Sequence, residues 1–326
     1  MSSYLLKKKY IWFSILVIIA LLNLWSCEKS IDIELHETKP KIKAFGLFEL
    51  GNPVNLSLAF TSSMTDEVLE HPINGANISL FQANQLVGQF TPSGVGQYLS
   101  DFTDYSPGDT LSFKTKLDDR LVSSTTVIPY PLNDVSIALD TVPKTRPAEQ
   151  FVLEFTISFQ DQSDVTNYYV VELWLRAIAD QSTSNFLYRV RSDDPVITKQ
   201  AYAQPLTFLT GANAITLPFT DESFNGQKRT IKFNYSPPGE ESTLGGEVTV
   251  QWIMKHEIVI VFRSISKSYY EYTTSAIRHI LARESDEIFG SSTPVPVVYN
   301  ISGGLGVFAC QHSISDTLTI NKIIIK

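Results

Sequence analysis

The sequence predicts a mainly β protein, and three observations support this. Short runs that alternate apolar and polar residues follow one another from Lys41 to Ile128, turn residues separate these runs, and longer apolar runs continue beyond Pro131. We expect an N-terminal immunoglobulin-like or transthyretin-like β-sandwich, followed by a larger β-rich domain with one amphipathic helix. The length of 326 residues, 43% of them hydrophobic, is sufficient for two domains.

The first thirty residues have the order of a secretory signal, with basic residues, an apolar run and small residues at a cleavage point. Lys7, Lys8 and Lys9 precede an apolar run that ends at Trp25. As a helix, the run from Ile11 to Trp25 would be about 22 Å long at ~1.5 Å per residue, against a hydrocarbon core of ~30 Å. A membrane span is therefore the poorer interpretation.

The end of this segment resembles the bacterial lipoprotein box, in which a small residue directly precedes a cysteine that is lipidated and becomes the first residue of the mature chain. Leu24, Ser26 and Cys27 fit this pattern. We therefore expect a signal peptide over residues 1–26 and lipidation at Cys27, where each buried methylene contributes ~0.8 kcal/mol of membrane affinity. An ordinary signal peptide with a cysteine near its end is the alternative.

The mature chain is distinctly acidic. Residues 1–26 hold three lysines and no acid, so the formal charge changes from -8 for the whole chain to -11 after cleavage. This balance argues against a nucleic-acid binder, because phosphate binding needs clustered basic side chains. Residues 27–38 form an acidic tether that resembles the surface-export signal of Bacteroidetes lipoproteins, although a solvated linker has the same composition. We favour the cell surface over the periplasmic face of the outer membrane.

The sandwich domain is expected over residues 39–129. Its predicted strands cover residues 41–49, 53–60, 76–81, 97–102, 110–116 and 121–128. In the second of these, Val54, Leu56, Leu58 and Phe60 fall at every second position, which indicates one buried and one solvated face.

The second domain is expected over residues 130–326, because the prolines at 129 and 131 cannot lie inside a strand ladder. Its predicted strands cover residues 152–159, 168–175, 229–235, 247–254, 257–262 and 318–325. A helix is expected near residues 265–282. It has one apolar stripe, whose tyrosines we expect to pack against the sheet, with a ligand platform as the alternative: Ile265, Tyr269, Tyr272, Ala276 and Ile280. Candidate caps and basic residues near the end of this helix are Ser264, Ser266, Arg278, His279 and Arg283.

No motif in the sequence predicts a catalytic, metal or cofactor site. The five histidines are isolated from one another, and no Gly-x-Ser-x-Gly elbow is present. We expect Cys310 to be a buried, inert thiol, and the glycines between Gly303 and Gly306 to form a turn or bulge with positive φ. Solvated loops are the interpretation for the acidic pairs, which are Asp118-Asp119, Asp193-Asp194, Glu240-Glu241 and the spaced pair Asp161 and Asp164.

Several phrases of the second domain together resemble a known family. They are Asn167-Tyr168-Tyr169, residues 192–195, residues 219–226, residues 264–272 and residues 294–308. These phrases resemble the Bacteroidetes lipoproteins grouped as domain of unknown function 4249. The resemblance implies lipidation, outer-membrane placement and frequent pairing with a TonB-dependent transporter, and it implies no enzyme activity and no agreed binding residues.

The expected function is that of a non-enzymatic outer-membrane lipoprotein, acting as accessory or ligand-binding partner of a TonB-dependent transporter. We expect contact with the membrane through the lipid anchor, no nucleic acid, no cofactor and no metal, and a small-molecule or peptide ligand that the sequence does not identify. A surface hydrolase with a dispersed acidic site and a structural or adhesive β-sandwich module remain the alternatives. Fold class alone does not decide among them.

Overall fold

The structure is a computed structural model, and it describes residues 40–62, 70–146, 149–179, 182–188, 190–199, 213–214, 216–235, 240–244, 247–251, 255–289, 295–320 and 323–325. The chain divides into two units, Met1–Lys39 and Pro40–Lys326. The expected signal peptide, the lipidation site at Cys27 and the acidic tether lie outside the described residues. They stay predictions.

The fold is mainly β, as the sequence predicts. The N-terminal strands are β1 (Ile42–Glu49), β2 (Val54–Thr61), β3 (Glu70–Pro72), β4 (Ile78–Gln82), β5 (Gln85–Gly94), β6 (Gln97–Ser100), β7 (Thr110–Leu117) and β8 (Arg120–Val127). Six of these match the expected strands. The sequence did not indicate β5, because it contains glycine and proline and its residues are mostly exposed.

Strand β5 joins the two layers of the N-terminal sandwich. Its first part pairs with β4 and its last part pairs with β6, with register shifts at both pairings. The chain therefore passes from one sheet to the other within a single strand. Between the layers lies one buried core, in which Val54, Leu56 and Leu58 are each at most 1% exposed. The alternating pattern correctly predicted which face of β2 is buried.

The remaining elements are β9 (Asn133–Arg146), β10 (Glu149–Gln160), β11 (Tyr168–Ala179), β12 (Ser182–Tyr188), β13 (Val190–Arg191), α2 (Pro195–Thr198), β14 (Asn213–Ala214), β15 (Thr216–Thr220), β16 (Lys228–Tyr235), β17 (Glu240–Leu244), β18 (Glu247–Gln251), β19 (Lys255–Ile265), α3 (Lys267–Phe289), β20 (Ile301–Ser302), β21 (Leu305–Ile320) and β22 (Ile323–Ile325). One sheet has the order β14-β13-β16-β10-β9. It packs against β11 and β19 through aromatic rings. The ring centroid of Phe159 lies 4.9 Å from that of Tyr169 and 4.8 Å from that of Phe262, so this second core is largely aromatic.

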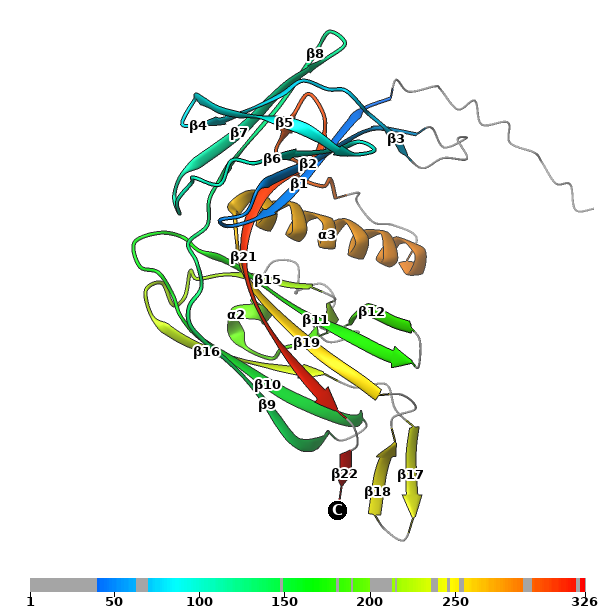
Figure 1. Ribbon diagram of the computed structural model, residues 1–326. Helices are drawn as coiled ribbons and strands as arrows, with labels where there is room; N and C mark the ends of the chain where they lie inside the picture. The colour runs from blue at the N-terminus through cyan, green and yellow to red at the C-terminus, as the bar shows by residue number, and fades with distance from the viewer. Residues whose placement is uncertain are drawn as a thin grey trace, which may run out of the picture. The chain divides into compact units, whose positions relative to one another are not determined.

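Strand β21 belongs to both halves of the fold, and Figure 1 shows it in red beside β1 and beside β19. Residues 305–311 pair in parallel with β1, and residues 311–320 pair antiparallel with β19. Phe308 and Cys310 therefore lie in the N-terminal core, although the sequence places them in the second domain. Ile128 belongs to one core and Leu132 to the other, whereas residues 40–326 form one compact unit, so the expected division into two domains stays a prediction.

Helix α3 begins later and ends later than expected. Ile265 is the last residue of β19, and Ser266 takes the position before the helix, where its carbonyl oxygen accepts bonds from the N–H groups of Tyr269 and Tyr270 at 3.1 Å. Its hydroxyl does not cap the helix but accepts a bond from the N–H of Cys310 at 3.3 Å. The expected cap is thus a link between the helix and β21.

The apolar stripe of α3 is only partly covered. Tyr269, Tyr272 and Ala276 are half-buried, and Ile280 is 54% exposed. The stripe therefore packs against the sheet only in part, since its last residue is exposed, and the expected basic end is wrong, because the helix continues to Phe289. Neither described helix combines the length and apolar composition that a membrane crossing requires.

Candidate functional site

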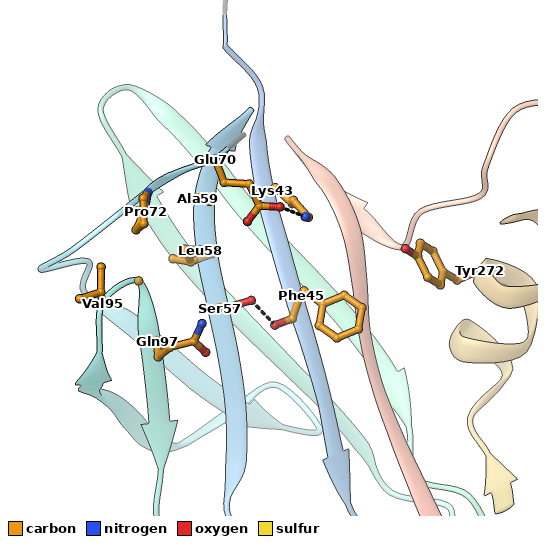
Figure 2. A pocket seen from close by; sticks show the side chains of 11 residues that line it. Lys43, Phe45, Ser57, Leu58, Ala59, Glu70, Pro72, Val95, Gln97 and Tyr272 are labelled. Carbon is orange, nitrogen blue, oxygen red and sulfur yellow. Dashed lines mark hydrogen bonds and ion pairs between the residues drawn. The ribbon is translucent and has the colours of Figure 1, made fainter. Parts of the chain in front are cut away.

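A groove of about 370 Å³ lies on the outward face of β1, β2 and β6 (Figure 2). Its floor contains a row of three neighbouring residues across these strands, in which Phe45 pairs with Ser57 and Ser57 pairs with Gln97. Ala44 is fully buried and Phe45 is 37% exposed, so the Phe45 ring is on the outer face of the sheet. The floor thus carries an aromatic ring where a half-buried strand usually has a polar residue.

One rim of the groove is the turn between β5 and β6, which contains Val95 and Gly96. Gly96 has a φ of 65°, its N–H donates to Asn74 Oδ1 at 2.8 Å, and its carbonyl accepts from the N–H of Leu58 at 2.9 Å. A Cβ atom at this position would lie 2.9 Å from the Leu58 oxygen and from Pro72 Cβ. Only glycine lets this turn approach the floor so closely. The rim is therefore held in place before any ligand binds.

The opposite rim is Tyr272 of α3, whose ring centroid lies 6.3 Å from that of Tyr299. Figure 2 shows the Phe45 ring on the side of β1 that is nearer to Tyr272. Burial raises the pKa of Tyr272, so its hydroxyl stays protonated at neutral pH. Ser268 fixes this end of the helix, because its hydroxyl donates to the Phe308 carbonyl at 3.2 Å and lies 3.0 Å from Thr126 Oγ1.

Charged and neutral polar side chains line the groove beside the aromatic rings. Lys43 and Glu70 form an ion pair at the upper end of the groove in Figure 2, and their side chains are 42% and 50% exposed. Ser57 donates its hydroxyl to the Phe45 carbonyl at 3.0 Å, and Gln97 is exposed. An exposed ion pair contributes at most about 1 kcal/mol, so a ligand can reorganise it at small cost. The groove therefore offers side-chain donors and acceptors without net charge.

The structure also locates the residues for which the sequence suggested chemistry. Within its described part, no group of three or more His, Cys, Asp or Glu side chains could hold a metal ion. Cys310 is fully buried, as expected, and burial raises the pKa of its thiol. Gly303, in the turn before β21, has a φ of 78°, and Gly306, the second residue of β21, has a φ of 114°, which confirms the expected turn with positive φ.

The comparison with protein families covers most of the chain. The model of a family described as a domain of unknown function, DUF4249, matches residues 28–316. The chain belongs to the DUF4249 family. The resemblance noted in the sequence is thereby confirmed at the level of the family. A comparison with curated proteins gives no match.

Two of the phrases that resemble DUF4249, residues 167–169 and 219–226, meet in a buried cluster of loop residues. Asp161 accepts bonds from the Tyr169 hydroxyl and from the N–H of Gly226, the latter at 2.6 Å. Asp221 accepts a bond from the N–H of Asn167 at 2.9 Å. The two carboxylates are 3% and 1% exposed, so the expectation of a solvated loop is wrong for Asp161. Buried backbone N–H groups and buried carboxylates need hydrogen-bond partners within the protein, and these bonds provide them.

A third DUF4249 phrase, residues 192–195, also has an internal role. Asp194 accepts a bond from the N–H of Val196 at 2.9 Å at the start of α2, and it pairs with Arg229 at 2.7 Å. Its side chain is 13% exposed, whereas the Asp193 side chain is 57% exposed. The solvated-loop expectation is therefore wrong for Asp194, which the neighbouring strand supplies with a guanidinium partner.

The last DUF4249 phrase, residues 294–308, is fixed by Asn300 in its described part. The Asn300 side chain accepts from the N–H of Phe308 at 2.9 Å and donates to the carbonyls of Phe308 and Thr125 at 2.8 and 3.1 Å. The N–H of Val298 donates to Ser275 Oγ of α3 at 2.9 Å. These bonds hold the segment between β8, β21 and the helix. The residues of this phrase therefore have a structural role next to the groove.

Sequence reasoning did not identify the groove residues of this DUF4249 protein. Lys43, Phe45 and Ser57 lie in strands that were correctly expected, and Tyr272 lies in the expected stripe. The available signal was the apolar character of β1 on both faces, since Phe45 follows the buried Ala44. That signal does not identify the other elements that line the groove.

Proposed function

We propose that this protein is a lipid-anchored outer-membrane protein that binds a ligand without transforming it and serves a TonB-dependent transporter as accessory partner. The observation that carries the binding role is the groove with Phe45 in its floor and Tyr272 at its rim. Ligand pockets typically have volumes of ~300–1,000 Å³ and combine apolar surface with a few convergent polar groups. The groove has both properties.

The proposed location rests on Cys27 and the segment before it. A basic, then apolar segment that ends in Leu24-Trp25-Ser26-Cys27 supports export and acylation at the cysteine. The acidic body gives no attraction to an anionic membrane surface, so the acyl chains would supply the membrane affinity. Family membership supports a transporter partner, because the resemblance implies frequent pairing with such transporters.

Replacing the lipidated residue tests the anchor. In Cys27→Ser, we expect labelling with a fatty-acid probe to disappear and the protein to leave the membrane fraction, as measured by fractionation and blotting. Unchanged labelling would contradict lipidation at this residue. Cys310→Ser is the matched control, because its thiol is buried in the fold and we expect normal labelling.

The partner and the face of the membrane need separate measurements. After mild crosslinking and detergent extraction of outer membranes, we expect affinity purification to recover a TonB-dependent transporter. Recovery of the lipoprotein alone would count against the accessory role. Protease added to intact cells is expected to cleave a surface-displayed protein, whereas complete protection would indicate the periplasmic face.

A further inference from the structure

We propose that the groove between the β5–β6 turn and Tyr272 binds a neutral saccharide, with the apolar face of a sugar ring packed on Phe45. This inference rests on the proposed binding function and names the chemical class of its ligand.

The main chain of the floor is already hydrogen-bonded and leaves no edge for a peptide strand. β1 pairs with β2 on one side and with β21 on the other, and β2 pairs with β1 and with β6 and β3. A peptide that adds a strand to a sheet needs unpaired backbone N–H and C=O groups. A ligand on β1 and β2 must therefore be recognised by side chains.

Two aromatic rings supply the apolar part of that recognition. Phe45 is 37% exposed on β1, at one end of the floor row, and Tyr272 is half-buried at the rim. Val95, which is 73% exposed, lines the groove from the other side. Packing a flat apolar face on an aromatic ring removes both surfaces from water, and the edge C–H groups of a sugar meet the negative face of the ring.

The polar side chains suit a ligand with many hydroxyl groups and no charge. Lys43 can donate a hydrogen bond, Glu70 can accept one, and Gln97 can do both. Because a hydroxyl group both donates and accepts, each of these side chains can bind one. The Lys43–Glu70 pair has no net charge, and the chain as a whole carries a formal charge of -8. An anionic ligand would be repelled by the body of the protein. The combination favours a neutral saccharide over a phosphorylated or carboxylated one.

The rim is pre-organised, which reduces the entropy cost of binding. Besides the bonds of Gly96, the Tyr98 hydroxyl donates to the Ile73 carbonyl at 2.7 Å and accepts from the N–H of Ala76 at 3.0 Å. These bonds fasten the segment that carries Asn74 and Pro72 to β6. The volume of about 370 Å³ limits the bound part to the size of a mono- or disaccharide.

The test uses the full-length protein in a detergent without a sugar headgroup. Saturation-transfer NMR and titration calorimetry would be run with maltose, cellobiose, lactose and diacetylchitobiose, with a glucuronate-containing disaccharide and a phenylalanine-containing tripeptide as comparators. We expect at least one neutral disaccharide to bind with a Kd below about 10 mM, and more tightly than either comparator. Absence of binding by all four, or tighter binding of a comparator, would overturn the proposal.

Variants connect the binding to the groove. We expect Phe45→Thr, which keeps a good strand former, to weaken binding at least about tenfold. Phe186→Thr is the matched control, because Phe186 is a 56% exposed phenylalanine on β12 that does not line the groove. Equal affinity of the Phe45 variant and wild type would refute the site. Should Phe45→Thr melt differently from wild type, Tyr272→Ala and Lys43→Gln give the same test, with weaker binding expected in both.

The outcome is separable from that of the proposed function. Anchoring and partner capture are measured without any saccharide, so failure of saccharide binding leaves them standing. Conversely, a Cys27→Ser protein that stays in the membrane would contradict the anchor while the binding data stand.

Discussion

Gly306 lies at the start of β21, next to β1, and its replacement by alanine should separate these strands. Its φ of 114° is in a region that residues with a side chain rarely adopt, which costs ~1–3 kcal/mol. An added Cβ would also lie 3.0 Å from the Ala44 carbonyl carbon and closer still to its oxygen. Relief of that contact requires the loss of ladder hydrogen bonds, each contributing ~0.5–1.5 kcal/mol. We expect Gly306→Ala to lower the free energy of unfolding by at least about 3 kcal/mol.

Gly51→Ala provides the matched control. Gly51 also has a positive φ, of 79°, but no atom outside its neighbours lies within 4 Å of the added Cβ. Only the cost of a left-handed residue applies there, ~1–2 kcal/mol. The reduced entropy of the unfolded chain affects both variants alike. Urea unfolding followed by far-UV circular dichroism would give both free energies by linear extrapolation. Values within about 0.5 kcal/mol of each other would refute the role assigned to the close contact.

Two further predictions concern buried charges. Glu172 and Arg263 pair at 2.6 Å, and their side chains are 9% and 15% exposed. Glu172→Ala should therefore lower the free energy of urea unfolding by about 3 kcal/mol, because the guanidinium loses its partner. The exposed control Glu271→Ala should change this free energy by less than about 0.5 kcal/mol, and an equal effect of both variants would contradict the role of the buried pair. Burial, together with the charge of Asp161, raises the pKa of Asp221, so the folded state binds this proton more tightly than the unfolded state, and the associated stability is present at low pH and lost as pH rises through the raised pKa. The stability of Asp221→Asn relative to wild type should therefore be greater at pH 7 than at pH 4, and a difference that does not change with pH would contradict it.

The fold could be predicted to a large extent, because strand signals are local. The alternation of Val54, Leu56 and Leu58 depends only on neighbours along the chain, and the structure buries these residues. Strand β5 was not predicted, because its composition does not favour a strand and it is stabilised by its pairing with β4 and β6. Asp161 and Asp194 were misplaced for the same reason, since their partners Gly226 and Arg229 are distant in sequence.

The sequence by itself determined the mainly β class, the membership of the DUF4249 family and the glycine turn before β21. Only the tertiary structure decided that β21 pairs with β1, and that Tyr272 and Phe45 line one groove. The physical reason is the range of the interactions involved. Backbone propensity and side-chain alternation act between near neighbours, whereas a groove depends on which faces distant segments leave uncovered.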